Sequence, residues 1–212
     1  MAISLKKGEG INLSKEVKEL QQVTVGLGWS ASTSGLTIDC DSFVYVLSEG
    51  SVLQQKTGLF TKLFGGDNPL KTHLCIKNAS DDIVYYGHLR HSSKCIIHHG
   101  DDLVGGAQGD CEQISIDLAK MPENVKGLVV GINIYSAYSK HQDFGKIKNC
   151  FGRVVDNGTR KEICRYDLSN DFGGYTAVIV GQFVRKDDGW HFEASGEGRK
   201  THSIQDLAKE FM

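Results

Sequence analysis

Residues 98–112, HHGDDLVGGAQGDCE, concentrate the residue types that bind hard cations. The carboxylates in this segment are Asp101, Asp102, Asp110 and Glu112. Calcium takes about 6–8 oxygen ligands at about 2.3–2.6 Å, and the glycines between these residues allow the backbone to fold tightly around one point. The segment is not an EF-hand, because the DxDxDG pattern followed by a glutamate is absent. It therefore predicts either a calcium-binding loop or a solvated acidic turn.

A second acidic pair, Asp39 and Asp41 in TIDCDSF, stands directly before a predicted strand. Residues two apart in extended backbone point to the same face, so both carboxylates share a face and Cys40 points the other way. Like charges that close repel each other unless a cation lies between them. The pair is interpreted as either metal ligands or polar residues of a strand-end turn.

Other patterns for chemistry are weaker. The sequence has no GxSxG nucleophile elbow and no GxxxxGK[ST] phosphate loop. His98 and His99 are adjacent, so in a strand they point to opposite faces and do not both reach one ion. A metal-dependent phosphoesterase would use one of them as its base. We therefore favour a non-enzymatic binding protein and keep the phosphoesterase as an alternative.

Six cysteines lie along the chain without a CxxC pair, and the start MAISLKKGEG turns polar too early for a secretion signal. This pattern predicts reduced thiols in a cytoplasmic protein and argues against a cysteine-rich zinc site. We expect most of the thiols to be small buried apolar groups. The cysteines are Cys40, Cys75, Cys95, Cys111, Cys150 and Cys164.

Composition excludes several classes of protein. The chain has 212 residues, 40% of them hydrophobic and 24% charged, which is ordinary for a globular protein that buries a core. A formal net charge of −2 without a block of Lys and Arg argues against a nucleic-acid binder. No apolar run approaches the about 18 residues of a membrane-spanning helix, so we expect no transmembrane segment.

Short alternating or apolar runs, separated by turns rich in glycine, predict many strands. These runs cover 23–29, 42–47, 83–86, 112–118, 128–135, 151–155, 177–185 and 190–194. No helical pattern stands between successive strands, so a parallel sheet is disfavoured. The prediction is an all-β fold: one domain over 1–212, an antiparallel β-sandwich with a short C-terminal helix over 203–211. Ser203 is the expected N-cap, and the apolar face of that helix is Ile204, Leu207, Ala208 and Phe211.

Residues 51–73 interrupt this pattern of strands and turns and are interpreted as an insertion. Within them, four apolar residues share helical spacing: Leu59, Phe60, Leu63 and Phe64. They predict either a short helix that packs over one end of the sandwich or an exposed surface that docks a partner or a membrane.

Several motifs together resemble the TerD family of bacterial tellurium-resistance and stress proteins over nearly the whole chain. In order they are ISLKKGEGINLSK, VTVGLGW, IDCDSFVYVL, HHGDDLVGGAQGDCEQISIDL, INIYSAYSKHQDFGKI, CRYDLS and GQFVRKDDGWHFEASGEG. The fourth is similar to the family signature GDN-x-TG-x-G-x-GDDE. The insertion at 51–73 suggests a longer member, similar to TerX.

The resemblance implies a β-sandwich that binds Ca²⁺ through acidic residues at one end. Matched by position, the expected ligands are Asp39, Asp41, Asp101, Asp102, Asp110 and Glu112. Asp102 replaces the asparagine of the signature. Gly106, Gln108 and Cys111 stand where related members often carry acidic residues. Because calcium affinity rises with ligand charge, one of two expected sites is weakened or lost.

In function, the resemblance implies a calcium-binding stress-response module that is not an enzyme. Its expected partners are other tellurium-resistance proteins, with the inner face of the membrane as a place of contact. The alternative is direct handling of tellurite by the cysteines, because tellurite oxidises thiols. Against it, no pattern in the sequence lowers a thiol pKa, and Cys111 stands among carboxylates that disfavour its thiolate.

Overall fold

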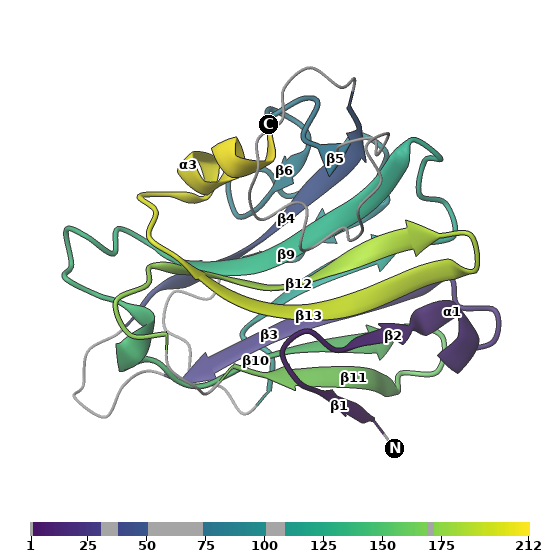
Figure 1. Cartoon of the computed structure of the whole chain (residues 1–212), viewed down its shortest axis with the longest axis horizontal. Helices are drawn as coiled ribbons and strands as arrows, with labels where there is room; N and C mark the ends of the chain where they lie inside the picture. Colours follow the sequence, from purple (N-terminus) through teal and green to yellow (C-terminus); the bar gives the residue numbers. More distant parts are fainter. Residues whose placement is uncertain (1, 31–37, 51–73, 101–108, 169–171) are drawn as a thin grey trace.

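The computed structural model describes residues 2–30, 38–50, 74–100, 109–168 and 172–212. Their strands form two stacked sheets, which confirms the predicted β-sandwich (Figure 1). The first sheet has the order β1 (Ile3–Leu5), β11 (Glu162–Asp167), β10 (Lys148–Asp156), β3 (Gln22–Ser30), β8 (Glu112–Asp117) and β7 (Ile96–His98). The second has the order β2 (Gly10–Asn12), β13 (Gly189–Arg199), β12 (Ala177–Lys186), β9 (Val125–Ile134), β4 (Cys40–Glu49) and β5 (Leu74–Cys75), and β6 (Ile83–Val84) pairs with β4.

The strand pairs are antiparallel with one exception among the described residues. β1 runs parallel to β11, with Ile3 opposite Cys164. These two strands lie far apart in sequence, so no tight hairpin forces them to be antiparallel. The hairpin between β12 and β13 turns at Asp187 and Asp188, between the predicted runs 177–185 and 190–194, and Gly189 leaves it with a φ of +115°.

The main core lies between the two sheets. Alternate residues of the long strands point into it, among them Val25 and Leu27 of β3 and Val44 and Val46 of β4. The opposite face of β4 is also buried, because α3 (Ile204–Ala208) and η2 (Lys209–Phe211) cover it at the top of Figure 1. Both faces of β4 are therefore fixed by packing.

The C-terminal helix follows the prediction closely. Ser203 is its N-cap and accepts a hydrogen bond from the backbone N–H of Asp206. The predicted apolar residues are buried, and the hydroxyl of Tyr45 donates to the carbonyl of Ile204 at 2.6 Å. Two short helices were not predicted: α1 (Leu13–Glu16) and η1 (Phe144–Lys146). They are too short to show a helical period.

The insertion at 51–73, with Leu59, Phe60, Leu63 and Phe64, lies outside the described residues. Its two interpretations, a covering helix or a docking surface, stay predictions. Among the residues that are described, none of the helices has the length and apolar character needed to cross a membrane.

Candidate functional site

Asp39 and Asp41 lie on the outer face of the second sheet. Cys40 points into the core between the sheets, so its two neighbours in the extended chain point away from it, as the spacing predicts. Asp41 is 3% exposed, and the Asp39 side chain is 17% exposed. The ammonium group of Lys140 lies 3.7 Å from Oδ2 of Asp39. Two largely desolvated carboxylates on one face create a position that favours a cation.

Asn133 adds a third oxygen beside this pair. It lies on β9 directly opposite Asp41 and is 3% exposed. Its side-chain N–H donates to the carbonyl of Ile134 at 3.1 Å, whereas its Oδ1 is buried and accepts no hydrogen bond from the described part of the chain. Sequence reasoning missed this residue. Its signal was a single amide within the apolar run 128–134.

Glu112 lies in a buried polar cluster at the start of β8. Its Oε2 accepts the backbone N–H of Ser42 at 2.7 Å and lies 3.4 Å from Nε2 of His98. The Ser42 hydroxyl is 2.8 Å from the same ring nitrogen. Nδ1 of His98 accepts the N–H of Gly100, so the imidazole proton is on Nε2. Glu112 thus ties β8 to β4 through Ser42.

This cluster is not a catalytic triad. A triad histidine contacts the hydroxyl through one ring nitrogen and the carboxylate through the other. Here Ser42 and Glu112 both face Nε2 of His98, and the His98 side chain is fully buried. His99 is exposed, and its Nε2 lies 2.7 Å from the hydroxyl of Ser115. Neither arrangement provides a base beside an open metal position.

Asp110 is clamped by Arg153 on the outer face of the first sheet. Its Oδ1 accepts from Nε of Arg153 at 2.7 Å and its Oδ2 accepts from the guanidinium at 2.9 Å. Gln113 donates to Oδ2 at 3.0 Å. The carboxylate lies against Gly26, where any Cβ would collide with it. This hydrogen bonding to Asp110 raises the pKa of Arg153 above its ordinary value. A cation at Asp110 would have to displace the guanidinium.

The described candidate carboxylates therefore do not converge. Asp39 and Asp41 lie outside the second sheet, Glu112 lies within a buried cluster, and Asp110 lies outside the first sheet. No three of these residues have donor atoms within 4.8 Å of one another. The expectation that acidic residues at one end of the sandwich bind Ca²⁺ stays a prediction, and these four do not form a single ligand group. Asp101 and Asp102 lie outside the described residues.

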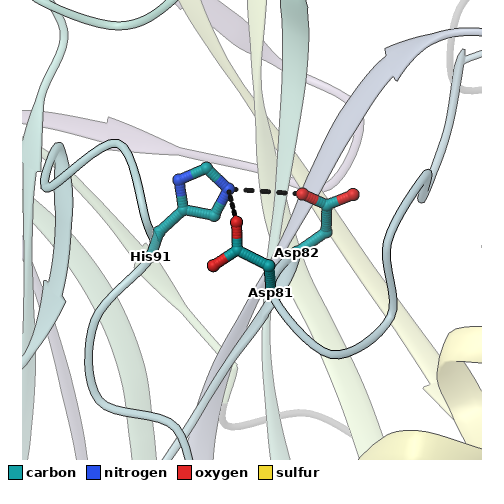
Figure 2. Close-up of side chains that lie close together, drawn as sticks. All are labelled: Asp81, Asp82 and His91. Atoms are coloured by element: carbon teal, nitrogen blue, oxygen red, sulfur yellow. Dashed lines mark hydrogen bonds and ion pairs between the residues drawn. The ribbon is translucent and has the colours of Figure 1, made fainter.

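A cluster that the sequence did not predict joins Asp81, Asp82 and His91, whose ligand atoms all lie within 4.8 Å of one another (Figure 2). Nε2 of His91 is 3.2 Å from Oδ1 of Asp82 and 3.4 Å from Oδ2 of Asp81. Hydrogen bonds hold the pKa of each aspartate below its ordinary value despite burial, which acts to raise it. The signal in the sequence was weak, because His91 follows Asp82 by nine residues, a spacing that matches no metal motif identified in the sequence.

Comparison with known proteins gives the family. The family model of the TerD domain matches residues 1–61 and 75–211. The chain belongs to the TerD family. Residues 62–74, which the TerD match leaves out, overlap the insertion predicted at 51–73.

Relatives of the TerD family cover the whole chain. The chain is 34% identical to "Stress response protein SCP2" of Bacillus subtilis (strain 168), over 100% of both proteins. It is 31% identical to "Tellurium resistance protein TerD" of Serratia marcescens, over 93% of this chain and 91% of that protein. It is 30% identical to "Tellurium resistance protein TerX" of the same organism, over 100% of both. These matches place it among the tellurium-resistance and stress-response proteins.

A solved TerD-like structure supports the fold. The crystal structure of a homologue of telluride resistance protein from Streptomyces coelicolor A3(2) superposes with a TM-score of 0.58 and 19% sequence identity, covering 87% of this chain and 94% of the other. A protein of unknown function superposes with a TM-score of 0.61 at 21% identity, covering 88% and 94%. At these identities the likeness shows the shared sandwich alone.

Proposed function

We propose that this TerD-family chain is a non-enzymatic stress-response module that binds Ca²⁺ at the outer face of its second sheet. The observation that carries the proposal is Oδ1 of Asn133, a buried oxygen that accepts no hydrogen bond within the described residues and lies beside Asp41. A buried polar oxygen is costly unless it has a partner. An ion between it and the carboxylates of Asp39 and Asp41 supplies that partner.

The chemistry of these donors favours calcium. Carboxylate and amide oxygens are the hard ligands that Ca²⁺ takes, whereas Mg²⁺ demands near-ideal octahedral geometry. Asp39, Asp41 and Asn133 supply three side chains from the chain before β4, from β4 and from β9. In this proposal Asp101 and Asp102, which lie outside the described residues, complete the shell, and the ion displaces Lys140 from Asp39.

The biological role follows from the family. We propose that the ion fixes the loops at this end of the sandwich in a shape that docks other tellurium-resistance proteins, in the cytoplasm and at the inner face of the membrane. The proposal assigns no catalytic residue, because His98 is buried and the Ser42 hydroxyl and the Glu112 carboxylate both lie beside its Nε2. Of the two histidines that the phosphoesterase alternative would use as its base, His98 is buried and His99 contacts Ser115.

Calcium should raise the melting temperature of the chelator-treated protein, and Asp41→Asn should remove the rise. At a free calcium concentration of about 100 times Kd, a ligand that binds only the folded state stabilises it by about 2.7 kcal/mol. The asparagine keeps the size of the side chain but removes one negative charge from the site. Thermal unfolding with and without calcium, and a calorimetric calcium titration, measure the effect.

Asp110→Asn is the matched control, because it makes the same chemical change on the opposite sheet. Its calcium affinity should stay within about twofold of the parent, although its stability falls. Magnesium at equal ionic strength should give no comparable rise. A full calcium response in Asp41→Asn would contradict the proposed ligand set. Loss of the response in Asp110→Asn, while Asp41→Asn keeps it, would also contradict that set.

The thiol alternative meets an obstacle in burial. Burial raises the pKa of Cys150 to about 12 and that of Cys164 to about 12. The pKa of Cys40 is also raised well above its usual value, first by burial and then by the neighbouring Cys150 and acidic side chains. Since the thiolate is the reactive form, these three cysteines should be inert at neutral pH.

Native protein should therefore react with a thiol reagent at only the two partly exposed cysteines, Cys75 and Cys111. At pH 8 a thiol of pKa about 12 has about one thiolate in ten thousand molecules. Labelling with a chromogenic disulfide, followed by mass mapping, gives the reactive positions, and denatured protein serves as the control for all six. Rapid labelling of Cys40, Cys150 or Cys164 in the native state would revive the thiol mechanism.

A further inference from the structure

We propose that Asp81, Asp82 and His91 form a second metal site, which takes a zinc-class transition metal and is independent of calcium. The aspartates end the turn between β5 and β6, and His91 lies between β6 and β7. None of these residues belongs to the proposed calcium ligands. The imidazole sets the class of ion, because histidine nitrogen suits Zn²⁺, Fe²⁺ or Ni²⁺, whereas calcium takes oxygen.

The distances between donor atoms fit a small metal ion. Two ligands in a tetrahedral zinc site, each about 2.0–2.1 Å from the ion, lie about 3.3 Å apart. Nε2 of His91 lies 3.2 Å from Asp82 and 3.4 Å from Asp81. Charge-assisted hydrogen bonds between nitrogen and carboxylate are shorter, at about 2.7–2.9 Å. The spacing therefore fits the edges of a metal coordination shell, and in the metal-free protein the same distances hold one Nε2–H shared between the two carboxylates.

Outer-shell hydrogen bonds hold both carboxylates in place. Oδ2 of Asp82 accepts the backbone N–H groups of Lys77 and Asn78 at 2.9 and 2.7 Å, which leaves Oδ1 facing His91. Ser92 donates to Asp81 from its backbone N–H at 2.9 Å and also from its hydroxyl. Such partners orient metal ligands and are a regular part of metal sites. The site is thus preorganised from the protein side.

Ser93 fits either protonation pattern of His91. Its backbone N–H donates to Nδ1 at 3.2 Å, which places the imidazole proton on Nε2, between the two carboxylates. Its hydroxyl oxygen lies 2.7 Å from the same Nδ1 and is able to accept a proton from it. When the metal binds the lone pair of Nε2, the imidazole proton is carried by Nδ1 instead, and Nδ1–H donates to the Ser93 hydroxyl. The ion thus replaces the proton at Nε2.

A second histidine, His88, lies beside the cluster. Nδ1 of His88 lies 3.0 Å from the carbonyl of Ile83, and because a carbonyl only accepts, Nδ1 carries the proton. Nε2 of His88 lies 3.9 Å from Oδ1 of Asp81. His88 is not one of the three residues whose ligand atoms all lie within 4.8 Å of one another, so it would have to move closer to join the proposed shell.

The test is a zinc titration of the full chain in competition with a chromogenic chelator, in buffer that contains millimolar calcium. The parent should bind one equivalent, and Asp81→Asn and His91→Gln should each weaken binding at least tenfold, since loss of even an outer-shell partner costs about 10–100-fold. His191→Gln is the matched control. It alters another histidine–aspartate pair, with Asp188 at 2.7 Å, that is not part of a three-ligand group among the described residues, and it should leave zinc affinity unchanged.

Cobalt supplies a second readout that does not depend on affinity alone. Co²⁺ in the parent should give the visible absorption of a four-coordinate site, and this band should be lost in both ligand variants. Circular dichroism of the metal-free variants shows that they fold, and Asp81 is the more exposed position should His91→Gln not fold. The proposed site is wrong if folded Asp81→Asn binds zinc as tightly as the parent, or if the parent shows no saturable binding of one zinc equivalent. Either result holds independently of whether the protein binds calcium.

Discussion

Arg153→Leu should lower the free energy of unfolding by about 3–5 kcal/mol, because it leaves a buried carboxylate without its countercharge. The Asp110 side chain is 2% exposed, and both of its oxygens accept hydrogen bonds from the guanidinium. Arg153 also contacts Glu162 at 3.1 Å, so the change loosens β8, β10 and β11 together. Urea denaturation at neutral pH measures the loss.

A double-mutant cycle separates the pair from its surroundings. Adding Asp110→Asn to Arg153→Leu neutralises the stranded charge, so the double variant should be more stable than Arg153→Leu alone. Lys15→Met is the control, since its ion pair with Asp188 is exposed on both sides and should contribute little to stability. If Arg153→Leu lowers the free energy of unfolding no more than the control does, the ion pair between Arg153 and Asp110 does not stabilise the fold.

Much of the sandwich was predictable because its long strands carry a clear period of two. The runs at 23–29 and 177–185 fall inside β3 and β12. The strands that sequence reasoning missed are mostly short: β1, β2, β5 and β7 have three residues or fewer. A strand of that length has no period to detect, and its place in the sheet is set by pairing with distant segments.

The candidate site was predictable only where local geometry decides it. Asp39 and Asp41 share a face because both lie in extended chain around Cys40. Asp110 and Glu112 have the same spacing, yet they point to different environments because β8 begins only at Glu112. Gly109 precedes them with a φ of +135°, outside the extended region. Alternation therefore does not apply across this boundary.

Tertiary contacts place the remaining functional candidates. Asn133 meets Asp41 through the pairing of β9 with β4, and His91 reaches the two aspartates through a turn. Neither relation leaves a recognisable motif in the sequence, because Asn133 and Asp41 lie far apart along the chain and His91 follows Asp82 only after nine residues. The composition of the acidic segment at 98–112 predicts a site at one end of the molecule. Which side chains meet there is set by strand register and turn geometry.

Glu112→Ala should lower the free energy of unfolding by about 2–4 kcal/mol, because it strands a buried donor and opens a cavity. The backbone N–H of Ser42 loses its acceptor at 2.7 Å, and His98 loses the carboxylate beside its Nε2–H. The tie between β8 and β4 through Ser42 is then broken. Chemical denaturation of the parent and the variant, in buffer with a calcium chelator, isolates this effect from ion binding.

Glu112→Gln distinguishes a structural tie from a calcium ligand. The glutamine oxygen still accepts the N–H of Ser42, so the metal-free variant should lose only about 1 kcal/mol. Its calcium affinity should equal that of the parent if Glu112 acts through Ser42 and His98. A variant of nearly parental stability that no longer responds to calcium would make Glu112 a ligand. The ion would then lie nearer to Ser42 and His98 than to Asn133.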